Sequence, residues 1–415
     1  MRILHVSPMY FPVLGGAELH LKEISEGLVA RGHDVTVLTT NIGHSWDLWD
    51  AKPANLESEE TINGVKIVRL QPNGGALGKL IRLGLEMPGA HRGMSWLLSP
   101  SGLDHFMQGP RAFGALPYLL SSRVDVVASM NWCWPLAYYC HLARRLKPFK
   151  LVGIPLLHTA EKWCNRGIYR RMFRNCDAVV ANTEFEAEFA RVRGARDVQA
   201  VGVGIHPEDF ERRDGRALRE AYHIGNHPVV GFVGRPTANK GIKTVIKAMR
   251  RVWKTHGEVR LLIAGPIPPV SRVDDLRLHE LTELERSKII TISDFKDEEK
   301  PSIFDALDVF VLPSVGESFG IAYLEAWICG KPVIGARIGP TSNVITEGVD
   351  GLLADPADPD DLAERLLELL SDPSKRERMG RSGKSKTLAR FTWGRIIEEM
   401  EGIYRNVVEG TARPR

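Results

Sequence analysis

Cysteine is scarce in this chain and forms no recognisable pattern. The five cysteines, Cys133, Cys140, Cys164, Cys176 and Cys329, include no C-x-x-C pair, which argues against a zinc ribbon or a redox pair. An odd number of unpatterned cysteines is typical of free thiols in a reducing cytoplasm, and no N-x-[ST] sequon occurs. The composition therefore excludes a disulfide scaffold and favours a cytoplasmic protein.

Long apolar runs and a one-sided charge are also missing. The stretch 126–142 is interrupted by Asn131, Pro135 and His141, so it does not predict a membrane span, and the first eight residues are too short and interrupted for a signal peptide. The 55 basic and 51 acidic side chains leave a net charge of +4 over 415 residues, which is too small to require a nucleic-acid partner. Hydrophobic residues at 43% and charged residues at 26% are typical of a soluble globular protein with two or three domains.

The glycine patterns of common nucleotide cofactors are absent as well. The pairs at 15–16 and 202–204 miss the G-x-G-x-x-G fingerprint, which disfavours NAD and FAD. Residues 383–385 end like a Walker A loop, but Arg378 stands where its first glycine belongs. Residues 358–360 look like a metal-binding D-x-D, but their place before an amphipathic segment indicates acids at a helix start. We therefore expect neither a metal nor a cofactor.

Strand–loop–helix–strand units open both halves of the chain. In the first half, apolar residues 3–6 precede a glycine loop, a helical period over 17–30 and a β-branched run at 34–39. The second half repeats this order at 228–233, 242–253 and 259–264 without a close sequence repeat. Such alternation predicts parallel sheets with right-handed crossovers, covered on both faces. The expected fold class is α/β, with a linker near 202–207 and a terminal helical segment at 386–408 that includes Leu388 on its apolar face.

Two loops combine glycine or cations with the start of a helix. Gly15 and Gly16 let the backbone approach a ligand where helix N–H groups favour an anion, although a plain tight turn explains them as well. The loop 234–241 places Arg235 and Lys240 after a parallel strand, where ligands bind in open α/β sheets. Both cations suit phosphate oxygens, and solvated surface charges are the alternative.

The loop 313–320 is the most specific of the three. It follows a buried strand, carries Glu317, and leads into a helix that starts near 319–320 and ends before Pro332. A carboxylate beside free helix N–H groups suits hydrogen bonds from sugar hydroxyls. Glu325 lies in an apolar part of that helix, where solvation does not explain it. A capping Glu317 with a buried structural Glu325 is the alternative.

The order and spacing of these motifs resemble retaining glycosyltransferases of the GT-B fold, specifically glycosyltransferase family 4 (glycosyl transferases group 1). The resemblance covers nearly the whole length, at 15–18, 31–37, 176–182, 234–241, 317–325, 330–334 and 347–353. It implies two Rossmann-like doubly wound domains facing a cleft. Residues 1–205 would bind the acceptor, with a C-terminal helix in 390–415 packing back on them, and residues 206–389 would bind the nucleotide sugar.

The resemblance also implies a role for each site residue. Arg235 and Lys240 would hold the diphosphate, Glu317 would contact the donor sugar, and Glu325 the ribose hydroxyls. The catalytic set is then Glu317, His158, Arg235 and Lys240, and the donor-binding set adds Gly15, Gly16, Ser318, Phe319, Gly320, Ile321 and Glu325. The chain departs from the family pattern at 236–239, at His206 and at 339–343, which bears on the contacts to the sugar ring.

The implied activity is transfer, with retention and without a metal, of a hexose-type sugar from a UDP-sugar, or a GDP-sugar, to a glycan, lipid-linked or small-molecule hydroxyl. A nucleotide-sugar epimerase or hydrolase of the same fold and a non-catalytic nucleotide-sugar binder stay open. Peripheral contact at the inner membrane face is open too, because the basic and apolar side chains of 162–174 suit an anionic lipid surface as well as a packed helix.

Overall fold

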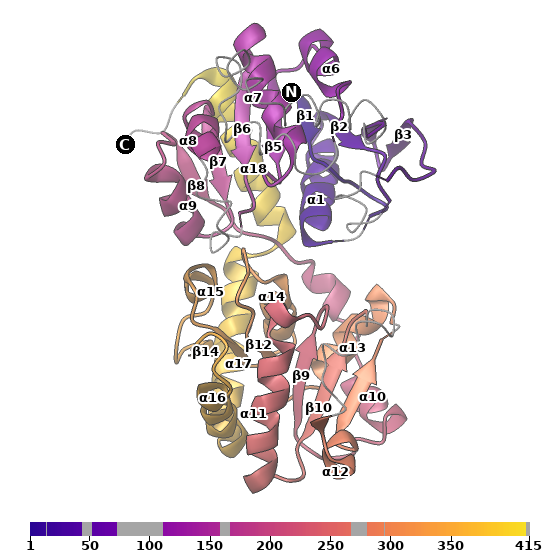
Figure 1. Cartoon of the computed structure of the whole chain (residues 1–415), viewed down its shortest axis with the longest axis vertical. Coiled ribbons are helices and arrows are strands. Elements are labelled where there is room, and N and C mark those ends of the chain that lie inside the picture. The colour runs from indigo at the N-terminus through magenta and orange to yellow at the C-terminus, as the bar shows by residue number, and fades with distance from the viewer. Residues whose placement is uncertain are drawn as a thin grey trace, which may run out of the picture. The chain divides into compact units, whose positions relative to one another are not determined.

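The computed structural model describes residues 1–13, 15–43, 52–72, 111–157, 167–266, 280–293 and 295–411. Within them the chain forms two compact units. The first consists of Met1–Gly202 together with Trp393–Arg415, and the second of Val203–Thr392. The last helix, drawn in yellow, thus belongs to the unit that contains the N-terminus (Figure 1).

The first unit is built on an eight-stranded sheet with the order β3-β4-β2-β1-β5-β6-β7-β8. All neighbouring strands are parallel except β3 and β4. The strands are β1 (Arg2–Val6), β2 (Asp34–Thr40), β3 (Glu59–Ile62), β4 (Val65–Leu70), β5 (Val126–Met130), β6 (Lys150–Ile154), β7 (Ala178–Ala181) and β8 (Val198–Ala200). The helices are α1 (Gly16–Ala30), α6 (Ala115–Ser121), α7 (Pro135–Leu146), α8 (Gly167–Arg174), α9 (Glu184–Arg191) and α18 (Trp393–Glu409), and α18 packs against α1.

The second unit has a six-stranded, fully parallel sheet with the order β11-β10-β9-β12-β13-β14. Its strands are β9 (Val229–Val233), β10 (Arg260–Ala264), β11 (Ile289–Ile292), β12 (Val309–Leu312), β13 (Val333–Ala336) and β14 (Gly351–Ala354). Its helices are α10 (Gly215–Ala221), α11 (Ile242–Thr255), α12 (Glu283–Arg286), α13 (Lys300–Asp305), α14 (Ile321–Ile328), α15 (Gly339–Val344), α16 (Pro359–Ser371) and α17 (Pro373–Arg390). Short 3-10 helices cover η2 (Pro207–Phe210), η3 (Ala238–Lys240) and η6 (Asp297–Glu299).

These sheets confirm the predicted α/β class, and the order of strands reverses once within each sheet. The chain leaves β9 toward β10 on one side and later returns to β12 on the other, so the order reverses between β9 and β12. In the first unit it reverses in the same way between β1 and β5. Ligands of open α/β sheets bind beyond the carboxyl ends of the strands at such a reversal. The loops after β1, β9 and β12 are therefore the ones placed for binding.

The terminal helical segment differs from the prediction. A single apolar face was expected over 386–408, but α17 ends at Arg390 and α18 begins at Trp393. Leu388 is exposed, whereas Ile396 and Met400 are buried in the first unit. The helix changes units at this break, so one continuous face was the wrong expectation.

The apolar side of α8 faces the core of the first unit. Ile168, Tyr169, Met172 and Phe173 are buried in it, while the arginines of the helix are exposed. The described part of 162–174 therefore behaves as an ordinary packed helix, and its first five residues lie outside the described residues. Among the helices that the structure describes, none is both long and apolar enough to cross a bilayer.

Candidate active site

The loops that follow β9 and β12 are joined by backbone hydrogen bonds. The carbonyl oxygen of Asn239 accepts the N–H of Val315 at 2.9 Å and the hydroxyl of Ser314 at 3.1 Å. A Cβ atom at Gly241, where φ is +82°, would clash with the carbonyl oxygen of Pro313. Glycine is thus required where the two backbones meet at the start of α11. The two loops form one hydrogen-bonded assembly at the sheet reversal of the second unit.

Lys240 and Glu317 face each other across this assembly. The Lys240 Nζ lies 2.6 Å from Oε2 of Glu317, and their side chains are 27% and 10% exposed. Within the described residues, Oε1 of Glu317 has no hydrogen-bond partner. A cation and a carboxylate with a spare acceptor therefore sit side by side, as a phosphate site next to a hydroxyl site requires.

Glu325 is held by a lysine that the sequence did not point to. Its Oε1 forms an ion pair with Nζ of Lys300, the first residue of α13. Burial alone would lower the pKa of Lys300, but the Glu325 carboxylate outweighs burial and raises it. Lys300 is therefore firmly charged next to Glu325. Only a structure reveals this pairing, because no sequence motif relates the two positions.

The start of α14 is shaped by glycine and an aromatic ring. Gly320 has φ of +91° and is the N-cap residue, and a Cβ atom there would clash with the ring of Tyr323. Tyr323 is fully buried and donates its hydroxyl to the carbonyl oxygen of Leu312 at 2.7 Å. Phe319 is buried against Phe391 with ring centroids 5.4 Å apart. These contacts hold the first N–H groups of α14 at the end of β12, beside the loop residues Ser318 to Ile321.

Arg235 is exposed in the loop after β9. Its guanidinium has no hydrogen-bond or ion-pair partner among the described residues. Gly234 just before it has φ of +139°, and its carbonyl oxygen lies where a Cβ atom of Gly265 would stand. The glycines bring the ends of β9 and β10 together and leave the Arg235 side chain available to an anion.

The remaining predicted residues belong to the first unit. Gly15 is the N-cap of α1 and Gly16 its first residue, so this glycine pair lies at a helix start as predicted. His158 lies outside the described residues. The described residue before it, Leu157, donates its N–H to the buried carboxylate of Glu186 at 2.8 Å. Sequence reasoning missed Glu186, which resembles an ordinary helix-surface residue in the sequence.

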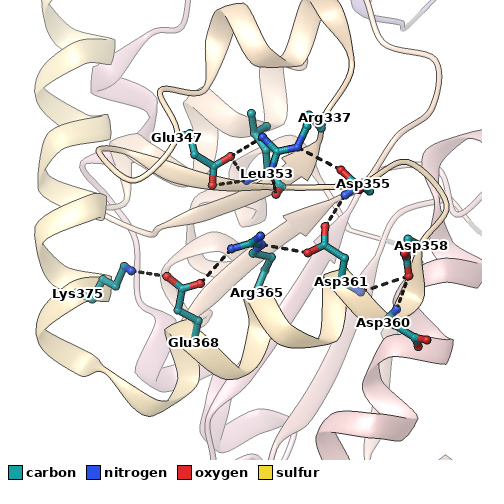
Figure 2. Close-up of polar contacts among 10 residues, drawn as sticks. All are labelled: Arg337, Glu347, Leu353, Asp355, Asp358, Asp360, Asp361, Arg365, Glu368 and Lys375. Atoms are coloured by element: carbon teal, nitrogen blue, oxygen red, sulfur yellow. Dashed lines mark hydrogen bonds and ion pairs between the residues drawn. The ribbon is translucent and has the colours of Figure 1, made fainter.

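The D-x-D sequence is a helix cap, as predicted. Asp358 accepts the N–H groups of Asp360 at 2.8 Å and Asp361 at 3.3 Å, and so caps α16 (Figure 2). Nearby carboxylates are paired with cations in the same view: Glu347 and Asp355 with Arg337, Asp361 with Arg365, and Glu368 with Arg365 and Lys375. No cluster of three or more metal-ligating side chains occurs within the described residues.

The two units with mainly parallel sheets are typical of the GT-B fold, and the comparisons identify the family. The family model of glycosyl transferases group 1 matches residues 216–386, and that of the glycosyl transferase 4-like domain matches residues 15–204. A D-inositol 3-phosphate glycosyltransferase of Corynebacterium urealyticum is 33% identical, over 95% of this chain and 91% of that protein. The chain therefore belongs to the group 1 glycosyltransferases.

Solved structures share the whole fold at low sequence identity. Sucrose-phosphate synthase of Thermosynechococcus elongatus matches with a TM-score of 0.74 and 22% identity, over 99% of each chain. HepE of Anabaena, solved in complex with UDP-glucose, matches with a TM-score of 0.70 and 18% identity, over 98% of this chain and 100% of that one. These likenesses establish the GT-B architecture.

Proposed function

We propose that this glycosyltransferase moves a hexose-type sugar from a UDP-sugar, or a GDP-sugar, to a hydroxyl acceptor with retention of anomeric configuration. The observation that carries the proposal is the Lys240–Glu317 pair at the sheet reversal, beside the start of α14 and the free guanidinium of Arg235. UDP is favoured because HepE was solved with UDP-glucose. Cys140, Cys176 and Cys329 are free thiols, which supports a cytoplasmic setting.

The chemistry follows from charge development. Breaking the bond between the anomeric carbon and the diphosphate oxygen leaves negative charge on that oxygen and positive charge on the sugar ring. Arg235, Lys240 and the first N–H groups of α14 would stabilise the diphosphate, which lets the reaction proceed without a metal. Glu317 would accept hydrogen bonds from the sugar, and Glu325 from the ribose. In the first unit, which would bind the acceptor, we propose Gly15, Gly16 and His158 as site residues.

Nucleotide binding is the first test. At about 100 times its dissociation constant, UDP or GDP should stabilise the protein by about 2.7 kcal/mol, whereas NAD should not. Arg235→Ala should abolish the rise in melting temperature, because it removes an unpaired phosphate ligand. Arg216→Ala, at an exposed arginine of α10 that pairs with Glu220, should keep it. A shift with NAD alone, or none in well-folded protein, would contradict the proposal.

Product formation separates the enzyme classes. UDP- and GDP-sugars are incubated with hydroxyl acceptors. Inositol phosphates are tried first, since the relative from Corynebacterium urealyticum is a D-inositol 3-phosphate glycosyltransferase. A transferase makes a glycoside, and Glu317→Gln should lower its rate about 100-fold or more. NMR of the anomeric proton then reports retention, and activity should persist in EDTA. An epimerase or hydrolase would change the donor without acceptor, and a binding protein would do neither.

A further inference from the structure

A second lysine–carboxylate pair accompanies the first at the same edge of the sheet. Lys300 begins α13, which follows β11, and Glu325 lies in the second turn of α14, which follows β12. Both helices therefore start at the carboxyl ends of the parallel strands, where the loops of the proposed donor site lie. The Lys300 and Glu325 side chains are 28% and 10% exposed, so the pair is largely buried but still in contact with solvent.

The two oxygens of Glu325 have different surroundings. Oε1 is bound to Nζ of Lys300. Within the described residues Oε2 has no hydrogen-bond partner, and it is not among the buried unsatisfied atoms. A carboxylate oxygen that solvent reaches and no side chain occupies is ready to accept a hydrogen bond from a ligand hydroxyl.

Resting on the function proposed above, we propose that Lys300 is a positioning residue for the donor nucleotide. By holding Oε1 of Glu325, it turns Oε2 toward the ribose hydroxyls. A lysine at a helix start opposes the helix dipole, so its charge there depends on nearby carboxylates, chiefly that of Glu325. Asp297, in the 3-10 turn before α13, adds further negative charge near Lys300.

The test compares a ribonucleotide with its 2′-deoxy form. Calorimetric titration of the full-length protein uses UDP or GDP, whichever raises the melting temperature, and the corresponding 2′-deoxynucleoside diphosphate. Wild-type protein should bind the ribonucleotide at least about tenfold more tightly, since a hydrogen bond to a carboxylate is lost in the deoxy form. Lys300→Met should bring this ratio close to one, and Lys300→Arg should retain most of it.

Control variants separate positioning from folding. Lys247→Met makes the same substitution at an exposed lysine of α11 and should leave the ratio unchanged. Glu325→Gln should lose the ratio, and Lys300→Met should have no further effect in that background. If Lys300→Met weakens both nucleotides equally or leaves the ratio intact, the positioning role is wrong. If wild-type protein binds neither nucleotide, the proposed function itself fails.

Discussion

At the scale of single residues, the candidate site contains two carboxylates, and one oxygen of each is paired with a lysine. Lys240 takes one oxygen of Glu317, and Lys300 takes one oxygen of Glu325. Largely buried carboxylates are costly unless paired, so each lysine stabilises a charge that the fold has removed from most of the solvent. The pairing leaves one acceptor oxygen on each glutamate, which is the chemistry needed to bind hydroxyl groups.

Gly320 is predicted to be indispensable for the start of α14. Gly320→Ala places a side chain at φ of +91° and against the ring of Tyr323, so the second unit should lose about 1–3 kcal/mol of stability. Gly316→Ala is the matched control, because a Cβ atom there meets no atom within 4 Å. Scanning calorimetry of both variants measures the difference. Equal melting temperatures would show that α14 starts without this constraint.

The sequence predicted both members of the Lys240–Glu317 pair but only the carboxylate, Glu325, of the second pair. Lys240 and Glu317 could be placed together because both follow neighbouring strands of a parallel sheet, whose carboxyl ends share one edge. Lys300 could not, since its side chain reaches Glu325 from a helix whose place beside α14 depends on the return of the chain from β11 to β12. Tyr323 was missed because a buried aromatic residue in an apolar helix has the pattern of ordinary core.

At the scale of elements, α17 packs closely on α14 and on the turn after it at two glycines. A Cβ atom on Gly380 would clash with the carbonyl oxygen of Gly330, and one on Gly383 with the indole ring of Trp327. Trp327 in turn donates to the carbonyl oxygen of Asp350 at 2.8 Å. The segment that looked like the end of a Walker A loop is therefore a helix-packing surface.

Two glycine-to-alanine substitutions should have opposite effects. Alanine favours a helix by about 1 kcal/mol over glycine, so Gly402→Ala in α18, where no atom lies within 4 Å of the new Cβ, should stabilise the protein. Gly380→Ala gains the same propensity but forces α17 away from the backbone of Gly330, just after α14, and should destabilise the protein by about 1–3 kcal/mol. Melting temperatures that move in the same direction would contradict the proposed packing.

Two features of the fold were not predicted from the sequence, each for a different reason. The hairpin of β3 and β4 turns at Asn63 and Gly64, with φ of 49° and 81°. An Asn-Gly pair between β-branched runs is a strong hairpin signal, so this turn could have been predicted from the sequence. The break between α17 and α18 gave no such signal. Both segments have helical periodicity, and the break between them lies where the chain passes from one unit to the other.

At the scale of the molecule, polar contacts in the first unit join the N-terminal elements β1 and α1 to the C-terminal helix α18. His5 of β1 is hydrogen-bonded to the hydroxyl of Ser25 in α1 at 2.7 Å and to that of Tyr404 in α18 at 3.1 Å. Glu401 of α18 pairs with Arg31 and with His33, just after α1. These polar contacts attach α18 where it packs on α1, so the last helix is an integral part of this unit's core.

Burial of three ionisable groups gives the first unit a predictable response to pH. Burial lowers the pKa of His5 to about 3 and of His20 to about 4. These histidines bind protons only after unfolding, so they destabilise the folded unit as pH falls below about 6.5. Burial raises the pKa of Glu186 to about 7, against the opposing N–H groups of Leu157 and Asn182. This carboxyl group stabilises the folded unit below about pH 4.5, and the contribution is lost as pH rises to 7.

The net slope of stability against pH should reveal all three groups. Near pH 5.5, unfolding binds about two protons at the histidines and releases about one from Glu186, so stability should rise by about 1.4 kcal/mol per pH unit. His5→Asn should nearly abolish this slope and Glu186→Gln should roughly double it, whereas His223→Asn, at an exposed position, should leave it unchanged. Calorimetric unfolding between pH 5 and 6 measures this slope. His5→Asn also removes two hydrogen bonds and so lowers the free energy of unfolding, but this loss does not affect the slope. A slope that neither variant alters would mean that the buried histidines and Glu186 titrate in the folded unit as they do in the unfolded chain.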